Sequence, residues 1–150
     1  MDDTDRKILA ELQKDGRLSV TELGDRIGLS LSPCHRRVRA LEQSGVISDY
    51  RANIDAAKVG LNFSAIVFAT LREGSRENVH AFEKALWAIP EITQAERLFG
   101  DPDYMLHVVT EDLKAFQALH DESLLALPSV LRLTSTLVMK SIFQNRPLPL

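Results

Sequence analysis

The chain has 150 residues, 45% of them hydrophobic, and a formal net charge of −3 at pH 7, which suit one ordinary domain or two small ones. No window approaches the roughly 18 uninterrupted apolar residues of a membrane span, and the acidic start MDDTD is unlike the positive start of a secretory signal, so we expect a soluble, cytoplasmic protein with no membrane partner. The single cysteine, Cys34, excludes an intramolecular disulfide.

Residues 1–28 predict two short helices. Acidic and hydroxyl side chains at residues 2–4 can cap the first helix, and Asp15-Gly16 breaks its pattern. Ser19 and Glu22 have the spacing of a capping box, in which each side chain satisfies the other residue's free N–H group at the start of the second helix. Each helix carries one apolar stripe: Ile8, Leu9 and Leu12 in the first, and Val20, Leu23 and Ile27 in the second.

A third helix is predicted between Ser30 and Gly45. Ser32 can accept a hydrogen bond from the free N–H groups of its first turn, and Pro33 stands where its missing N–H does no harm. One stripe of this helix is apolar and must face a core: Cys34, Val38 and Leu41. The sequence therefore predicts three short helices around one small core, in the order of a helix-turn-helix unit.

The polar face of the third helix is basic. Within residues 30–45, three arginines against one glutamate give a charge of 3 − 1 = +2 with histidine neutral, although the whole chain is at −3. The distribution of charge matters more than its total when one face docks on DNA. The candidate DNA-binding residues are Ser32, His35, Arg36, Arg37 and Arg39. Two other interpretations stay open: the cations form only a solvated face, or the three helices pack together with no DNA role.

The pattern changes near residue 46, where a second region begins. Val46–Ile54 contains strand-forming residues and Asp55–Asn62 loses periodicity, which predicts a strand and then a linker. The elements expected after the linker are strands at 63–71, 92–99, 104–109 and 130–138, with helices around Val79, Phe82 and Leu86 and around Leu113, Phe116, His120, Leu124 and Leu127. This βαββαβ order is the ferredoxin-like arrangement, an antiparallel sheet with both helices on one face.

The predicted fold class is thus α+β, with two domains. A winged-helix-like helix-turn-helix domain occupies residues 1–50, a strand end and linker occupy 51–62, and a ferredoxin-like domain occupies 63–150. One face of the sheet lacks cover, because the strand around Ala65-Ile66-Val67-Phe68 is apolar on both sides. We therefore expect the sheets of two or more copies to pack together in a homo-oligomer. Two recognition helices on a twofold axis would then read two half-sites.

Candidate catalytic and metal-binding residues form no recognisable motif. The histidines lie on different predicted elements without metal-site spacing: His35, His80, His107 and His120. The chain contains no glycine-rich phosphate loop, no HExxH and no GxSxG, so we expect no enzyme, no bound metal and no cofactor. A small ferredoxin-like enzyme stays open on fold alone. So does an architectural protein that wraps DNA with little sequence choice.

Segments from both halves of the chain resemble one family of prokaryotic transcription regulators. The run 29–50, LSLSPCHRRVRALEQSGVISDY, resembles the DNA-binding segment of the Lrp/AsnC (feast/famine) family, and 5–9, DRKIL, resembles its opening helix. The run 100–104, GDPDY, is similar to the turn of the family's effector domain. The run 127–130, LPSV, followed by TST at 134–136, resembles its closing strand. The resemblance covers nearly the whole chain.

The resemblance implies a regulator that binds double-stranded DNA and responds to a small molecule, usually an amino acid. Family members form dimers that assemble into rings, commonly octamers, and the ligand sits where dimers meet. The effector-binding residues that it implies are Gly100, Asp101, Asp103, Thr134, Ser135 and Thr136. From the residues alone, Asp101 and Asp103 can equally be turn residues that bond their own backbone. The chain departs from the family pattern before the turn, where Glu96 and Phe99 replace a common tyrosine and threonine.

Overall fold

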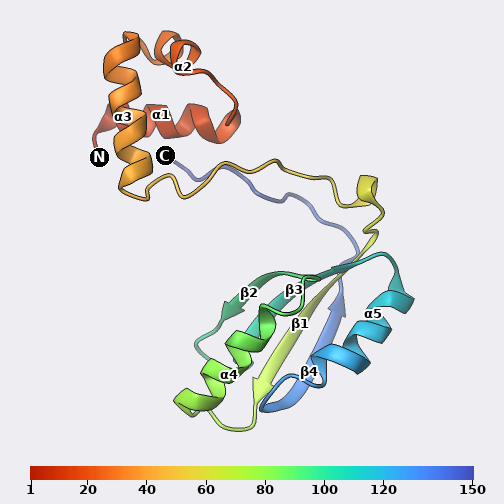
Figure 1. The fold of residues 1–150 in the computed structure, drawn as a ribbon. Coiled ribbons are helices and arrows are strands. Elements are labelled where there is room, and N and C mark those ends of the chain that lie inside the picture. Colours follow the sequence, from red (N-terminus) through yellow and green to blue (C-terminus); the bar gives the residue numbers. More distant parts are fainter. The chain divides into compact units, whose positions relative to one another are not determined.

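The computed structural model describes residues 1–150 and divides them into two compact units (Figure 1). The first unit comprises residues 1–54 together with 142–150, and the second comprises 55–141. The tail at residues 142–150 thus groups with the helices of the first unit. None of the helices combines the length and the apolar character needed to cross a membrane.

Three helices form the first unit: α1 (Asp3–Lys14), α2 (Val20–Ile27) and α3 (Leu31–Gln43). The predicted capping box of α2 is present, because the Ser19 N–H donates to Glu22 Oε2 at 2.9 Å and the Glu22 N–H donates to Ser19 Oγ at 3.2 Å. A second capping box, formed by Asp2 and Asp5, begins α1. The predicted stripes meet in one core, whose buried members are Ile8, Leu9, Leu23, Cys34, Val38 and Leu41.

Two predictions for this unit are wrong. Helix α3 begins at Leu31, with Ser30 rather than Ser32 at the N-cap position. Pro33 therefore occupies the third helical position, which it tolerates because the N–H groups of the whole first turn lack helical partners. The expected strand at Val46–Ile54 is absent, since no neighbouring segment forms a ladder with it. Its only backbone bond to the helices runs from the Ile47 N–H to the Leu41 carbonyl, at 3.1 Å.

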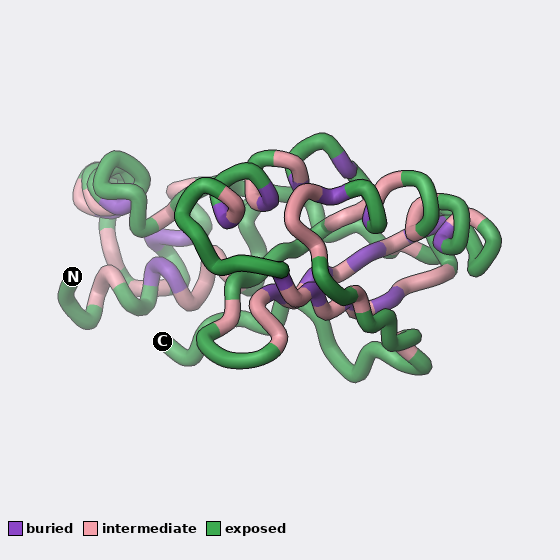
Figure 2. Tube along the Cα trace, turned by 90° about the horizontal axis from the view of Figure 1, so that it is seen from below, coloured by how far each residue is buried: buried purple, intermediate pink, exposed green.

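The tail formed by residues 142–150 is held on α1 by a side chain. The Leu148 N–H donates to Gln13 Oε1 at 2.6 Å, and Gln13 Nε2 donates back to the Leu148 carbonyl at 3.4 Å. Asn145 Nδ2 also donates to Asn53 Oδ1 at 3.2 Å. The tail is exposed along its length and is green up to the mark C in Figure 2. Polar contacts, not buried apolar area, therefore hold it in place.

The second unit has the predicted βαββαβ order, after a short 3-10 turn at Ala57–Val59. Its elements are β1 (Phe63–Leu71), α4 (Arg76–Leu86), β2 (Ile92–Arg97), β3 (Tyr104–Thr110), α5 (Leu113–Leu119) with a π-helical turn at His120–Leu124, and β4 (Val130–Leu137). The strand order is β2-β3-β1-β4 and all neighbours are antiparallel. Both helices cover one face of the sheet (Figure 1). The ferredoxin-like prediction is confirmed.

The core of the second unit lies between this sheet face and the two helices. Alternate residues of β1 and β3 are buried there, as expected for strands with one covered face. The helices contribute Phe82 and Leu86 from α4 and Phe116 from α5. Leu113, which we expected on the apolar stripe of α5, is exposed at the first position of the helix instead. The opposite sheet face carries no element of this unit.

Tyr104 brings a titratable group into this core. Its side chain is 2% exposed, its ring centroid lies 4.6 Å from that of Phe82, and its hydroxyl donates to Glu83 Oε1 at 2.9 Å. Burial, followed by the hydrogen bond to Glu83 and the charge of that carboxylate, raises the pKa of Tyr104 from 10.0 to about 12. The neutral phenol is therefore the form that the folded unit stabilises.

We expect the free energy of unfolding of this unit to fall as the pH rises from about 10 to about 12. In that window the unfolded chain loses the Tyr104 proton while the folded chain keeps it, so unfolding becomes more favourable. Urea unfolding at a series of pH values, followed by far-UV circular dichroism, measures the loss. Tyr104→Phe should remove it; the same pH dependence in that variant would contradict the assignment.

Candidate functional site

A tight turn sets α3 against α2. Gly28 ends α2 with φ at +75°, and the Leu29 N–H donates to the Gly24 carbonyl at 2.9 Å. Gly24 itself is buried, and a Cβ built on it would lie 2.6 Å from the carbonyl oxygen of Leu29. That atom is backbone and cannot rotate away. Only glycine at position 24 therefore allows this close approach of the turn to α2.

Gly24→Ala should lower the free energy of unfolding of the first unit by about 1 to 3 kcal/mol, because the added methyl group forces the turn away from α2. It should also weaken DNA binding, since α3 follows the turn. Thermal unfolding monitored by far-UV circular dichroism, together with a DNA-binding titration, tests both effects. Gly74→Ala is the matched control, because a Cβ at Gly74 meets nothing within 4 Å. Equal stability of the two variants would contradict the close-approach argument.

The solvent face of α3 carries cations that are free of intramolecular partners. Arg36 and Arg39 are exposed, and neither forms an ion pair or a hydrogen bond within the chain. Side chains that are three or four positions apart on a helix lie on one face. Arg36 and His35 precede Arg39 by three and four positions, so both lie beside it. Ser32, in the first turn, is exposed as well. This face therefore combines positive charge with hydrogen-bond donors that are free to meet an anionic partner.

Arg37 is placed differently from its neighbours. Its Nη1 atom lies 2.8 Å from Asp2 Oδ2 and 2.8 Å from Asp5 Oδ1, the two residues of the capping box of α1. Hydrogen bonds to Asp5 and Asp2 raise the pKa of Arg37, and the backbone of Asp5 together with Arg37 lowers the pKa of Asp2. Arg37 therefore ties α3 to the beginning of α1.

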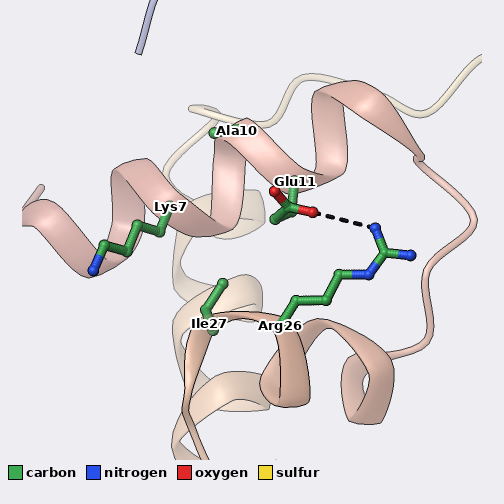
Figure 3. A pocket seen from close by; sticks show the side chains of 5 residues that line it. All are labelled: Lys7, Ala10, Glu11, Arg26 and Ile27. Atoms are coloured by element: carbon green, nitrogen blue, oxygen red, sulfur yellow. Dashed lines mark hydrogen bonds and ion pairs between the residues drawn. The ribbon is translucent and has the colours of Figure 1, made fainter.

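A second ion pair joins α1 to α2 beside a small hollow of about 230 Å³ (Figure 3). Glu11 lies 2.6 Å from Lys14 Nζ and 3.2 Å from Arg26 Nη1. Hydrogen bonds from Lys14 and Arg26 hold the pKa of Glu11 below its usual range. Glu11 and Arg26 at this hollow thus serve the packing of the two helices.

In the second unit, the turn between β2 and β3 meets the ends of two other strands. Gly100 has φ at +146°, which favours glycine. Asp101 Oδ1 lies 3.4 Å from Thr70 Oγ1 and 3.4 Å from Arg132 Nη2, so the turn, β1 and β4 converge on this carboxylate. The contacts are long and exposed, so they leave room for another partner of the carboxylate and of the guanidinium.

Asp103 makes the contacts of a turn residue. Its Oδ2 atom accepts a hydrogen bond from the Leu71 N–H at 2.8 Å, and its own N–H donates to the Ala69 carbonyl at 3.0 Å. Both bonds fasten the turn to the end of β1. Asp103 thus supports the position of Asp101, whose carboxylate points to side chains instead.

The three hydroxyl residues on β4 do not share one face of the sheet. Thr134 and Thr136 stand opposite Phe68 and Ile66, whereas Ser135 stands opposite the buried Val67. Arg132 precedes Thr134 by two residues and so lies on the same face. The structure therefore groups Asp101 with Thr70 and Arg132 and places Thr134 next to them. The sequence prediction omitted Thr70 and Arg132 from the site, although the period of two in β4 could have identified Arg132.

The uncovered face of the sheet is apolar at its centre. Antiparallel partners on β1 and β3 supply its central side chains, which are half-buried in the single chain: Ile66 opposite His107, and Phe68 opposite Met105. Val109 continues the row opposite Ser64. Such a surface is typical of a face that packs against another protein surface.

Comparison with known proteins gives a match for each unit. Residues 1–48 match the model of a winged helix-turn-helix DNA-binding family, and residues 64–148 match the model of the Lrp/AsnC ligand binding domain. The chain is 38% identical over 148 residues to the leucine-responsive regulatory protein of Escherichia coli (strain K12), which covers 99% of this chain and 90% of that protein. It is 36% identical over 150 residues to the Bkd operon transcriptional regulator of Pseudomonas aeruginosa, covering 100% and 98%.

A solved structure matches the fold over the same length. The crystal structure of a transcriptional regulator from Neisseria meningitidis in complex with L-Met is similar to this chain with a TM-score of 0.93 and 34% sequence identity. The match covers 99% of this chain and 96% of that chain.

Proposed function

This chain belongs to the Lrp/AsnC family of DNA-binding transcriptional regulators, and on that premise we propose that α3 reads a specific operator while the second unit senses an amino acid. The observation that carries the proposal is the exposed pair Arg36 and Arg39, unpaired on one face of α3. Arginine can bond two acceptors of guanine in the major groove at once, which gives sequence discrimination.

The other basic and polar residues of α3 support this contact in different ways. His35 shares the face of Arg39 and can reach bases or phosphates beside it. Ser32 stands at the helix N-terminus, where a hydroxyl and free N–H groups favour a phosphate oxygen. Arg37, held by Asp2 and Asp5, fixes the angle of α3 on α1 and contributes to binding through that position.

The uncovered sheet face pairs two copies in this proposal. Packing Ile66, Phe68 and Met105 against a second sheet removes the apolar surface from water and gives a dimer with two reading helices. Two heads on one operator gain avidity, because the second contact becomes intramolecular. Dimers then assemble into a closed ring, an octamer of four dimers, as the family resemblance implies.

The amino acid would bind at the turn between β2 and β3 where dimers meet. Its ammonium group fits the Asp101 carboxylate, and its carboxylate fits Arg132 with the hydroxyls of Thr70 and Thr134. Gly100 has no side chain to cover the backbone of the turn, and Asp103 fastens the turn to β1. Ser135 and Thr136 follow Thr134 on β4, next to the proposed contact with the ligand carboxylate. That a Neisseria meningitidis relative was crystallised with L-Met supports an amino acid as the ligand class.

A thermal-shift screen of the amino acids tests the sensor role. At least one should raise the melting temperature of the parent, because a ligand that binds only the folded state stabilises it. Asp101→Asn should show a smaller shift than the parent, and in the absence of ligand it should melt like the parent. Asp103→Ala should melt at a lower temperature without ligand, since the Leu71 N–H loses the acceptor that fastens the turn to β1. If no amino acid shifts the parent, the sensor role is wrong.

A further inference from the structure

The helix-facing side of the sheet has a second open region, between α4 and the edge strand β2. Ala95 and Arg97 stand opposite Leu106 and Tyr104, so all four point to the helix side. Leu106 and Tyr104 are buried, whereas Ala95 and Arg97 are exposed. The helices therefore cover β3 but stop short of β2. The space left between α4 and β2 is a groove of about 500 Å³.

Part of the groove wall is apolar. Its walls include Leu86, Trp87, Ile89, Pro90 and Ile92, from the end of α4, the loop that follows and the start of β2. Trp87 is 90% exposed at the rim, an unusual position for the largest apolar side chain. A volume of about 500 Å³ falls within the usual range of small-molecule sites, roughly 300 to 1,000 Å³. The groove is thus large enough to bind one apolar side chain of a small molecule.

Two opposite charges line the same groove without neutralising each other. Glu83 accepts the hydrogen bond of the Tyr104 hydroxyl at 2.9 Å and has no cation partner. Arg97 stands in register opposite Tyr104 and forms no ion pair or hydrogen bond within the chain. The charges of both residues act on the Tyr104 hydroxyl, one raising and one lowering its pKa. A carboxylate and a guanidinium are therefore both available to one bound molecule.

We propose that this groove binds a free amino acid with a large apolar side chain, whose ammonium group meets Glu83, whose carboxylate meets Arg97, and whose side chain packs against Trp87. A zwitterion can pair with Glu83 and Arg97 at once, whereas a ligand with a single charge leaves one of these two residues without a partner. The site is separate from the one at Asp101. The contacts of Asp101 are Thr70 and Arg132 at the opposite face of the sheet.

Trp87 is the single tryptophan of the chain, so its emission reports on this groove. Titration of the full-length protein with L-methionine, L-leucine or L-phenylalanine should shift the emission to shorter wavelength as the indole is covered. Analogues of L-methionine test each charge: N-acetyl-L-methionine lacks the ammonium, and L-methioninamide lacks the carboxylate. Each analogue should bind about tenfold more weakly or worse, the usual loss when a charged hydrogen-bond partner is removed. Glycine, with both charges and no side chain, should give no shift.

Matched variants separate the groove from the rest of the unit. Glu83→Gln and Arg97→Gln should each weaken the L-methionine response about tenfold or more. Glu77→Gln and Arg76→Gln remove the same charges from exposed positions of α4 outside the groove and should respond like the parent. Because Arg97 is exposed, Arg97→Gln should fold like the parent. It therefore tests the groove even if Glu83→Gln folds poorly. Asp101→Asn should also keep the Trp87 response, even where it loses the thermal shift of the turn site.

Four outcomes would overturn the proposal. These are unchanged Trp87 emission at millimolar amino acid, equal responses to L-methionine and its two analogues, parent-like responses in both charge variants, and loss of the response in Asp101→Asn. Emission that already lies at short wavelength and shifts to longer wavelength on dilution would assign the groove to a second copy of the chain instead.

Discussion

The double variant Arg36→Ala, Arg39→Ala is expected to bind its operator on the order of 100-fold more weakly than the parent, or worse. Each bidentate arginine contact to a base is worth about 1 to 3 kcal/mol, and the two side chains share one exposed face of α3. Fluorescence anisotropy with labelled DNA from upstream of its own gene, at fixed salt, measures the loss. Repeating the titration over a range of salt should give a slope that falls by about one for each lost phosphate contact.

Two other arginine variants show whether the loss of operator affinity depends on the position of the arginines on α3 or only on the loss of positive charge. Arg76→Ala removes the same charge from α4 and should leave DNA binding unchanged. Arg37→Ala should lower the melting temperature of the first unit, because it separates α3 from Asp2 and Asp5. A double variant that binds like the parent would show that another surface reads DNA. Equal binding of the parent to operator and random DNA would favour an architectural role.

The second large effect is expected from Phe68→Glu. Phe68 lies at the centre of the uncovered sheet face, opposite Met105 and Thr134. A carboxylate buried there between two sheets would cost several kcal/mol, so the dimer should separate into single chains. Operator affinity should then fall by about 10² to 10⁴, because two heads are no longer linked. Sedimentation and DNA titration of the same samples measure both effects.

The control for this variant is Gln117→Glu, which adds the same charge at an exposed position of α5. It should keep the mass and the operator affinity of the parent. The far-UV circular dichroism spectrum of the Phe68→Glu chain should match that of the parent, since the residue lies on the face opposite the helix-covered core. Should Phe68→Glu keep the parent's mass, the sheet face is not the contact between copies.

Local signals account for the parts of the fold that the sequence predicts well. The capping box at Ser19 and Glu22 and the stripe of Cys34, Val38 and Leu41 involve residues within a few positions of each other. The βαββαβ order follows equally from short periodic runs. Such patterns depend only on residues close together in the chain, which is why they predict the observed helices and strands correctly.

Contacts between distant segments explain the rest. Val46–Ile54 has the composition of a strand but no neighbouring segment to pair with, and no property of the segment itself reveals that. The partners of Arg37 come from 35 and 32 residues earlier, so spacing within α3 could not separate it from Arg36 and Arg39. Likewise, Asp101 meets Thr70 and Arg132 only because three segments end at the same place.

The bond pair between Gln13 and Leu148 has a practical consequence for work with this protein. Residues 1 and 150 both belong to the unit that carries α3, even though residues 55–141 lie between them in the chain. A purification tag or fluorescent label at either terminus is therefore attached to the DNA-binding head. Labels meant to follow the sensing unit alone are better placed at an exposed internal residue such as Lys84 or Gln117.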